Sequence, residues 1–214
     1  MLLRASGGGR IYIRIWGFRR QHRLQRRARS RGGQRNSHPR DRRQRDVWAR
    51  RGEKSVGLYW FENDGEGDFT QHVIHTRSDE RLERHAIADI NGDGRPEIVI
   101  VDNMIGSLLW FEYEGDPRDK DSWSHHYISD GGLPGAYDVS VADFDGDGNL
   151  DVAASSWIWG NQFTWFENRG DRWVKHVIEG NVSETRTIRA ADINGNGRMA
   201  LLGTGSGAWS GNLV

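Results

Sequence analysis

Three short landmarks recur in this chain with a common period close to fifty residues, and that period limits the folds available to it. Acid-rich segments begin at Asp89, Asp143 and Asp192, spaced by 54 and 49 residues. Trp-Phe-Glu begins at residues 60, 110 and 165, and His-(Val/Tyr)-Ile begins at residues 72, 126 and 176. Because the landmarks keep the same order in each unit, the sequence indicates a repeat protein.

Short apolar runs next to the acidic segments predict strands. EIVIVD follows the first segment and LDVAAS follows the second, and both have the length and apolar character typical of buried strands. Each unit therefore reads as strand, acidic loop, strand, Trp-Phe-Glu strand, polar turn and His-containing strand. Four strands in about fifty residues is the size of one β-propeller blade. We predict an all-β fold, a partial β-propeller of four-stranded blades with about three blades represented.

The second acidic loop, DFDGDGNLD, predicts a cation site. It places Asp143, Asp145, Asp147 and Asp151 at positions 1, 3, 5 and 9, and the carbonyl of Asn149 at position 7. Carboxylates this close repel one another, and a calcium ion with its six to eight oxygen ligands would offset the repulsion. Glycines at positions 4 and 6 allow the positive φ that such a loop needs. The alternative is an acidic turn that holds no ion.

The other two loops repeat the pattern with fewer carboxylates. In the first loop, DINGDGRPE, the candidate ligands are Asp89, Asn91, Asp93, Arg95 and Glu97. In the third loop, DINGNGRMA, which has Ala200 at position 9, they are Asp192, Asn194 and Asn196. Since ligand charge tunes calcium affinity, we expect the second loop to bind most tightly and the third most weakly. Whether the third loop binds metal stays open.

An EF-hand does not explain these loops. Its loop needs a glutamate at position 12 and a helix on each side. Position 12 is Ile100, Ala154 or Gly203 here, and the flanking segments read as strands. We therefore predict that each acidic loop joins two antiparallel strands.

The segments DINGDGRPEIVIVD and DFDGDGNLDVAAS, together with the recurring WFEN, resemble the FG-GAP/VCBS-type repeats of calcium-binding β-propellers. Integrin alpha-chain heads and many secreted bacterial proteins carry such repeats, and the bacterial VCBS-like branch is the more similar. The resemblance covers residues 46–214 and implies that the loop positions above are calcium ligands. It also implies an extracellular or cell-surface location. The last unit stops before its Trp-Phe-Glu strand, so we interpret the chain as a fragment of a longer propeller.

The first 45 residues differ from the rest in charge. Residues 1–50 hold 16 arginines and two acids, a net charge of +14, whereas residues 51–214 carry −14. We predict an Arg-rich, low-complexity, disordered segment over 1–45 and the repeats over 46–214. A second hypothesis is a frameshift, because Asp46 precedes Trp60 by 14 residues, as Asp151 precedes Trp165. A basic arm for nucleic acid is disfavoured, since no nucleic-acid-binding motif accompanies it.

The function predicted from these features is a non-catalytic, calcium-stabilised scaffold for extracellular adhesion or for recognition of a protein or carbohydrate ligand. The alternative is the propeller of a secreted carbohydrate-active enzyme, of the polysaccharide lyase or sugar dehydratase type. No nucleophile–base motif is visible, and no segment has the length and hydropathy of a membrane span. The periodic histidines are predicted to pack. Trp157 and Trp159 break the period, so we expect inter-blade packing, with an aromatic platform for a sugar or partner as the alternative.

Overall fold

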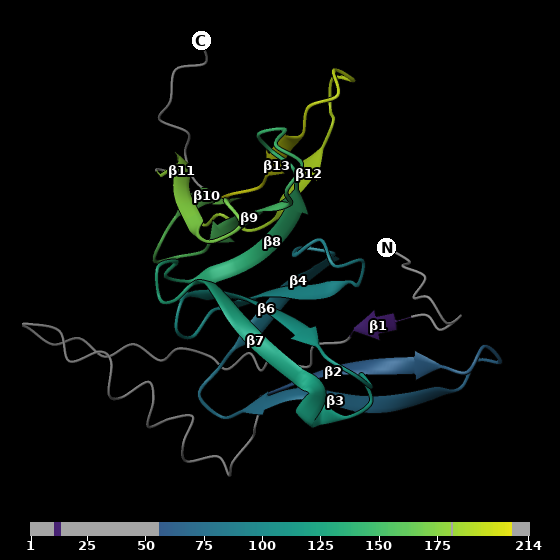
Figure 1. The fold of residues 1–214 in the computed structure, drawn as a ribbon. Coiled ribbons are helices and arrows are strands. Elements are labelled where there is room, and N and C mark those ends of the chain that lie inside the picture. Colours follow the sequence, from purple (N-terminus) through teal and green to yellow (C-terminus); the bar gives the residue numbers. More distant parts are fainter. Residues whose placement is uncertain (1–10, 14–55, 181, 207–214) are drawn as a thin grey trace, which may run out of the picture.

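The computed structural model describes residues 11–13, 56–180 and 182–206. The elements in chain order are β1 (Ile11–Ile13), β2 (Val56–Asn63), β3 (Phe69–Arg77), β4 (Leu82–Ala88), β5 (Glu97–Asp102), β6 (Ser107–Tyr113), the 3-10 helix η1 (Lys120–Ser122), β7 (Trp123–Ser129), β8 (Ala136–Ala142), β9 (Asp151–Ser156), β10 (Gln162–Asn168), β11 (Trp173–Glu179), β12 (Ile188–Ala191) and β13 (Ala200–Gly203). Figure 1 follows these elements from the blue β2–β3 pair to the yellow β12–β13 pair.

The strands form antiparallel sheets that follow one another along the chain. Two sheets have four strands, in the orders β4-β5-β6-β7 and β8-β9-β10-β11. Each of them contains one complete repeat, so the prediction of an all-β fold with four-stranded blades is confirmed. Strands β2 and β3 carry the Trp-Phe-Glu and His motifs of a preceding unit, and β12 and β13 flank the third acidic loop. The first strands of successive sheets, β4, β8 and β12, lie beside one another.

Strand β5 of the β4-β5-β6-β7 sheet is buried on both faces, which explains its continuous apolar run. Side chains alternate between the faces of a strand, so β5 supplies both neighbouring cores. Ile98 and Ile100 pack against Leu58 and other side chains of the preceding sheet. Val99 and Val101 pack against Val152, Phe166 and other side chains of the following sheet. Every residue of β5 is buried as a result.

The periodic histidines pack as predicted. Each lies opposite the tryptophan of the adjacent strand, and the two rings stack, with centroids 4.5 Å apart for Trp60–His72, 4.4 Å for Trp110–His126 and 4.6 Å for Trp165–His176. The glutamate of each Trp-Phe-Glu motif contacts the histidine Nε2, at 3.2, 2.6 and 2.8 Å respectively. The stacked ring and the carboxylate account for the recurrence of all three residue types.

The polar segment between β6 and β7 reaches back to the preceding sheet. The indole N–H groups of Trp60 and Trp123 both donate to the Pro117 carbonyl, at 3.0 and 2.9 Å. Beside them, the Arg118 guanidinium forms an ion pair with Glu62 of β2. This segment is therefore a clamp between two sheets, which its polar sequence alone does not indicate.

The packing expectation for Trp157 and Trp159 is met only in part. Trp157 lies 5.6 Å from the Tyr137 ring and 5.4 Å from the Arg186 guanidinium, so it packs as expected. Trp159 is 64% exposed, and the packing prediction is wrong for it, because its turn directs the ring away from the core. In the segment 1–45, β1 pairs antiparallel with β2. The rest of that segment, with the predicted boundary at residue 46, lies outside the described residues.

Candidate metal centre

The three acidic loops are the turns between the first two strands of a sheet. They join β4 to β5, β8 to β9 and β12 to β13, which are antiparallel pairs. The prediction that the loops connect antiparallel strands is thus confirmed. Position 9 is the first residue of the second strand in each case: Glu97, Asp151 and Ala200. The side chain at position 9 therefore has a fixed backbone and points from the sheet into the turn.

Each loop is held by the same three hydrogen bonds from backbone N–H groups to loop side chains. The position-1 carboxylate accepts from the position-6 glycine N–H, at 2.9 Å in the first loop, 3.1 Å in the second and 2.9 Å in the third. The side chain at position 3 accepts a hydrogen bond from the backbone N–H of position 5, and the side chain at position 5 accepts one from the backbone N–H of position 7. Glycines at positions 4 and 6 have φ between 71° and 92°. These bonds shape the loop and turn its polar side chains inward.

In the first loop, Asp89, Asp93 and Glu97 come together, with one oxygen of each within 4.8 Å of the others. Glu97 is only 2% exposed, and its Oε2 accepts from the Ile90 N–H at 2.8 Å. Burial, together with smaller contributions from the charges on Asp93 and Asp89, raises the pKa of Glu97 to about 7. The Asp89 Oδ1 atom is buried without any hydrogen-bond partner. A buried carboxylate oxygen with no partner is costly, and a bound cation would satisfy it.

In the second loop, Asp143, Asp145 and Asp151 form the corresponding cluster, again with oxygens within 4.8 Å. Asp151 is fully buried and accepts from the Phe144 and Asn168 N–H groups, at 3.0 and 2.8 Å. Burial raises the pKa of Asp151, and the charge of Asp145 contributes in the same direction. The folded chain thus holds a buried acid against two other carboxylates, an arrangement that a cation would stabilise.

Arginine distinguishes the first loop from the second. Both carboxylate oxygens of Asp93 face Arg95, whose Nη2 lies 2.6 Å and whose Nε lies 3.0 Å from Oδ2. The hydrogen bond from Arg95 lowers the pKa of Asp93. The corresponding Asp147 in the second loop accepts only from the N–H and the amide of Asn149. A cation at the first loop would therefore compete with a guanidinium for Asp93.

The third loop keeps the hydrogen-bonded frame and lacks the cluster. Asp192 and Asn194 accept the same backbone N–H groups as their counterparts. Ala200 stands where the other loops have a buried acid, and it is exposed. Within the described residues, the carboxylate clusters therefore occur at the two loops that have an acid at position 9.

Asn168 connects the first two loops, and the sequence analysis did not identify it. Its side-chain amide donates to the Leu150 carbonyl at 3.1 Å and to the Ile90 carbonyl at 3.3 Å. Its backbone N–H binds Asp151. One buried residue thus contacts position 2 of the first loop and position 9 of the second. The only signal in the sequence is its place directly after the third Trp-Phe-Glu motif.

Comparison with protein families agrees with these repeats. The family model described as FG-GAP-like repeat matches residues 43–100 and again residues 89–154. The two matches together cover more than half of the 214 residues. The chain belongs to the FG-GAP-like repeat family. No curated protein matches it significantly. In the FG-GAP-like matches, the first loop lies in both segments and the second loop in the later one.

The predicted ligands of the FG-GAP-like repeats fall into two groups. The structure brings six of them into the two clusters: Asp89, Asp93 and Glu97, and Asp143, Asp145 and Asp151. The remaining predicted ligands lie outside the clusters and form hydrogen bonds with other groups. Asp147 binds Asn149, Asn91 donates to Glu112 at 3.2 Å, and the Arg95 guanidinium donates to the Tyr113 carbonyl at 2.9 Å. The donor set is composed of oxygen atoms, as a hard cation such as calcium requires. The residues present therefore fit calcium at the first two loops.

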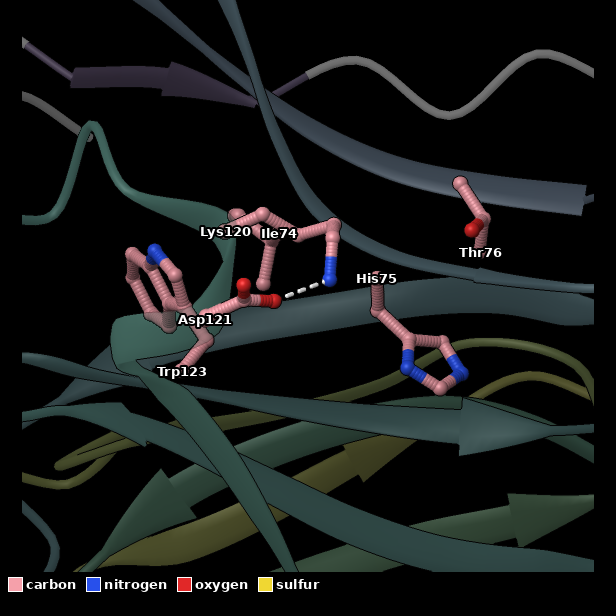
Figure 2. A pocket seen from close by; sticks show the side chains of 6 residues that line it. All are labelled: Ile74, His75, Thr76, Lys120, Asp121 and Trp123. Carbon is pink, nitrogen blue, oxygen red and sulfur yellow. Dashed lines mark hydrogen bonds and ion pairs between the residues drawn. The ribbon is translucent and has the colours of Figure 1, made fainter.

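A pocket elsewhere in the FG-GAP-like chain offers no comparable site. It lies beside the β6–β7 clamp and is lined by Ile74, His75, Thr76, Lys120, Asp121 and Trp123. Figure 2 shows Lys120 directed at Asp121, with which it forms an ion pair. His75 binds Glu80 at 2.8 Å. The charged lining groups thus already have partners, so the pocket offers neither an unpaired base nor a cluster of cation ligands.

Proposed function

We propose that this chain is a non-catalytic β-propeller scaffold that is stabilised by calcium and recognises an extracellular ligand. The observation that carries the calcium part is the pair of carboxylate clusters, one of which contains the buried and unpartnered Asp89 Oδ1. Membership of the FG-GAP-like repeat family supports a propeller-like scaffold. Extracellular calcium modules work at dissociation constants of roughly 0.1–1 mM, which suits short, partly exposed loops such as these.

Calcium would act on the fold through the inner hairpin of each blade. The clusters join position 1, after the first strand, to position 9, at the start of the second strand. A cation there neutralises repelling carboxylates and links the two strands. The second loop has four aspartates and no arginine, so we expect it to bind calcium more tightly than the first. The third loop, without an acid at position 9, is expected to bind least.

An extracellular location is part of the same proposal. FG-GAP-like repeats are typical of extracellular proteins, and millimolar calcium is available there. Among the described residues, no helix has the length and hydropathy needed to cross a membrane. Secretion would be tested by locating the full-length natural protein in cell fractions, and recovery of all of it from the cytosol would contradict this part.

Calorimetric titration of the full chain with calcium tests the proposal. We expect two saturable sites, reduced to one by Asp89→Asn or by Asp145→Asn, because each removes a clustered carboxylate. Asp192→Asn is the matched control and should leave the two sites unchanged. Circular dichroism establishes that each variant is folded. A folded wild-type chain that binds no calcium at millimolar concentrations would refute the calcium part.

A further inference from the structure

The structure holds a row of rings and guanidinium groups at the end of the sheets opposite the acidic loops. Arg84 of β4 lies over the Tyr137 ring of β8, with Cζ 5.0 Å from the ring centroid. Tyr137 contacts Trp157, whose other ring neighbour is Arg186. Trp159 lies in the same turn as Trp157, whose carbonyl accepts from the Trp159 N–H at 2.7 Å, and we call these five residues the aromatic platform. In an antiparallel sheet, the turn after the second strand lies at the opposite end from the turn after the first, so the platform is separate from the metal loops.

The backbone beneath the platform is strained. In the described residues, positive φ at a non-glycine residue occurs at Ile158, Asn161 and Glu184, with φ of 59°, 48° and 49°. All three lie in the two turns that carry the platform, and Glu184 N–H donates to the Asn161 side chain at 2.9 Å. A β-branched residue such as Ile158 rarely adopts this conformation. Non-glycine residues with such backbone conformations persist where the surrounding structure holds them, and they cluster at ligand-binding sites.

The strained turn exposes a large aromatic ring. Trp159 is 64% exposed, and Ile158 is 43% exposed. Gly135, just before β8, allows the turn to lie close, because a Cβ there would be 2.0 Å from the Trp157 carbonyl oxygen and 3.5 Å from Trp159 Cε3. Trp159 is therefore placed beside the strand that carries Tyr137. An exposed indole held by tight backbone packing is a preformed contact surface.

The charges of the platform are suited to an anion. Arg84 is exposed, and its contact with the Tyr137 hydroxyl is long, at 3.5 Å. Among the described residues, no carboxylate lies within ion-pair distance of Arg84. Arg186 has a half-exposed side chain and a single exposed partner, Glu184, at 3.3 Å. A guanidinium fork matches the two oxygens of a carboxylate, so both arginines are available to bind one.

We propose that the aromatic platform binds an acidic oligosaccharide, a chain of sugar rings that carry carboxylates. The apolar face of a sugar ring would lie on Trp159, and the sugar carboxylates would pair with Arg84 and Arg186. An acidic peptide is the less favoured occupant, because Trp159 and Arg186 lie in turns and present no strand edge for a peptide to extend. This inference rests on the proposed recognition function and specifies its ligand class.

Binding of two matched hexasaccharides to the full chain tests the inference. The probes are a β-1,4-linked glucuronic acid hexamer and cellohexaose, which share ring geometry and differ in charge. Titrations are followed by tryptophan fluorescence and calorimetry, once with calcium and once with EDTA. We expect the acidic hexamer to bind and cellohexaose to bind at least about tenfold more weakly. Trp159→Ala, and separately Arg84→Gln with Arg186→Gln, should each weaken binding of the acidic hexamer about tenfold.

Met104→Ala is the matched control, since Met104 is 47% exposed in the corresponding turn of the preceding sheet and lies outside the platform. It should leave affinity unchanged. The inference would be overturned if both hexamers bound equally well, or if the platform variants bound the acidic hexamer as tightly as the wild type does. The inference would also be overturned if a polyglutamate peptide bound more tightly than the acidic hexamer and lost affinity in the same variants. If calcium binds but neither hexamer does, the ligand class is wrong and the calcium scaffold stands. If the acidic hexamer binds and no calcium site is found, the ligand class stands and the calcium scaffold is wrong.

Discussion

Replacing Glu97 with glutamine separates the cost of a buried charge from the gain of a bound cation. Glu97 is 2% exposed, and burial raises its pKa from 4.5 to about 7. The folded chain therefore binds this proton more tightly than the unfolded chain. Its free energy of unfolding should fall as the pH rises from about 4.5 to about 7, and then level off. At about 1.4 kcal/mol per pKa unit, the loss attributable to Glu97 is about 3 kcal/mol.

Glutamine keeps the shape and the acceptor for the Ile90 N–H while it removes the titration. In EDTA at pH 8, the variant should therefore be more stable than the wild type by up to about 3 kcal/mol. At pH 4, where the wild-type side chain is protonated in both states, the two should be nearly equal. With calcium at about 2 mM the advantage of glutamine should shrink by about 0.6–1.8 kcal/mol, because calcium at a dissociation constant of roughly 0.1–1 mM stabilises only the chain whose glutamate supplies the charged ligand.

Urea unfolding followed by tryptophan fluorescence measures these differences. Curves are recorded at pH 4, 6 and 8, with EDTA and with calcium, for the wild type and for Glu97→Gln. Glu66→Gln, a substitution in the exposed β2–β3 turn, is the matched control and should follow the wild type. A glutamine variant that is less stable than the wild type in EDTA at pH 8 would refute the reasoning, because burial of the charge would then carry no net cost.

Three further substitutions test other parts of the structure. Ala200→Asp supplies the missing acid of the third loop and should add one calcium site in a calorimetric titration; unchanged stoichiometry would mean that the frame is insufficient. Asn168→Ala leaves the Ile90 and Leu150 carbonyls without their donor and should lower stability by about 1–3 kcal/mol in urea unfolding. Trp60→Phe keeps an aromatic ring opposite His72 but loses the bond to Pro117 and some buried volume, and should lower stability by at least about 1 kcal/mol. Losses below about 0.3 kcal/mol at either site would contradict the assigned bonds.

Local patterns explain why most of the fold could be predicted. The run EIVIVD indicated a buried strand, and β5 is buried on both faces. The spacing of Trp110 and His126 indicated a repeated packing role, and the rings stack across adjacent strands. Such features depend on neighbours in sequence or on the strand directly opposite. The repeat period places those neighbours correctly even when the arrangement of the blades is unknown.

Contacts between sheets could not be read from the chain in the same way. Pro117 lies in a polar segment that reads as a surface loop, yet its carbonyl accepts two indole N–H groups. Asn168 looks like the last residue of a strand, yet its side chain reaches Ile90 in the loop between β4 and β5 of the neighbouring sheet. The exposure of Trp159 depends on a turn with positive φ at Ile158, which a β-branched residue would not suggest. The first two contacts depend on how neighbouring sheets pack, and the third outcome depends on a turn conformation that the residue types do not indicate.

The acidic positions alone overstate the number of clustered ligands. Asp147 and Asp93 occupy equivalent positions, but the first faces Asn149 and the second faces Arg95. Position 9 matters more, because its backbone is fixed at the start of a strand and its carboxylate is buried. The clusters form where that acid is present. In these repeats, position 9 is therefore the residue that separates a loop with a carboxylate cluster from a loop without one. Ala200→Asp directly tests whether that difference decides calcium binding.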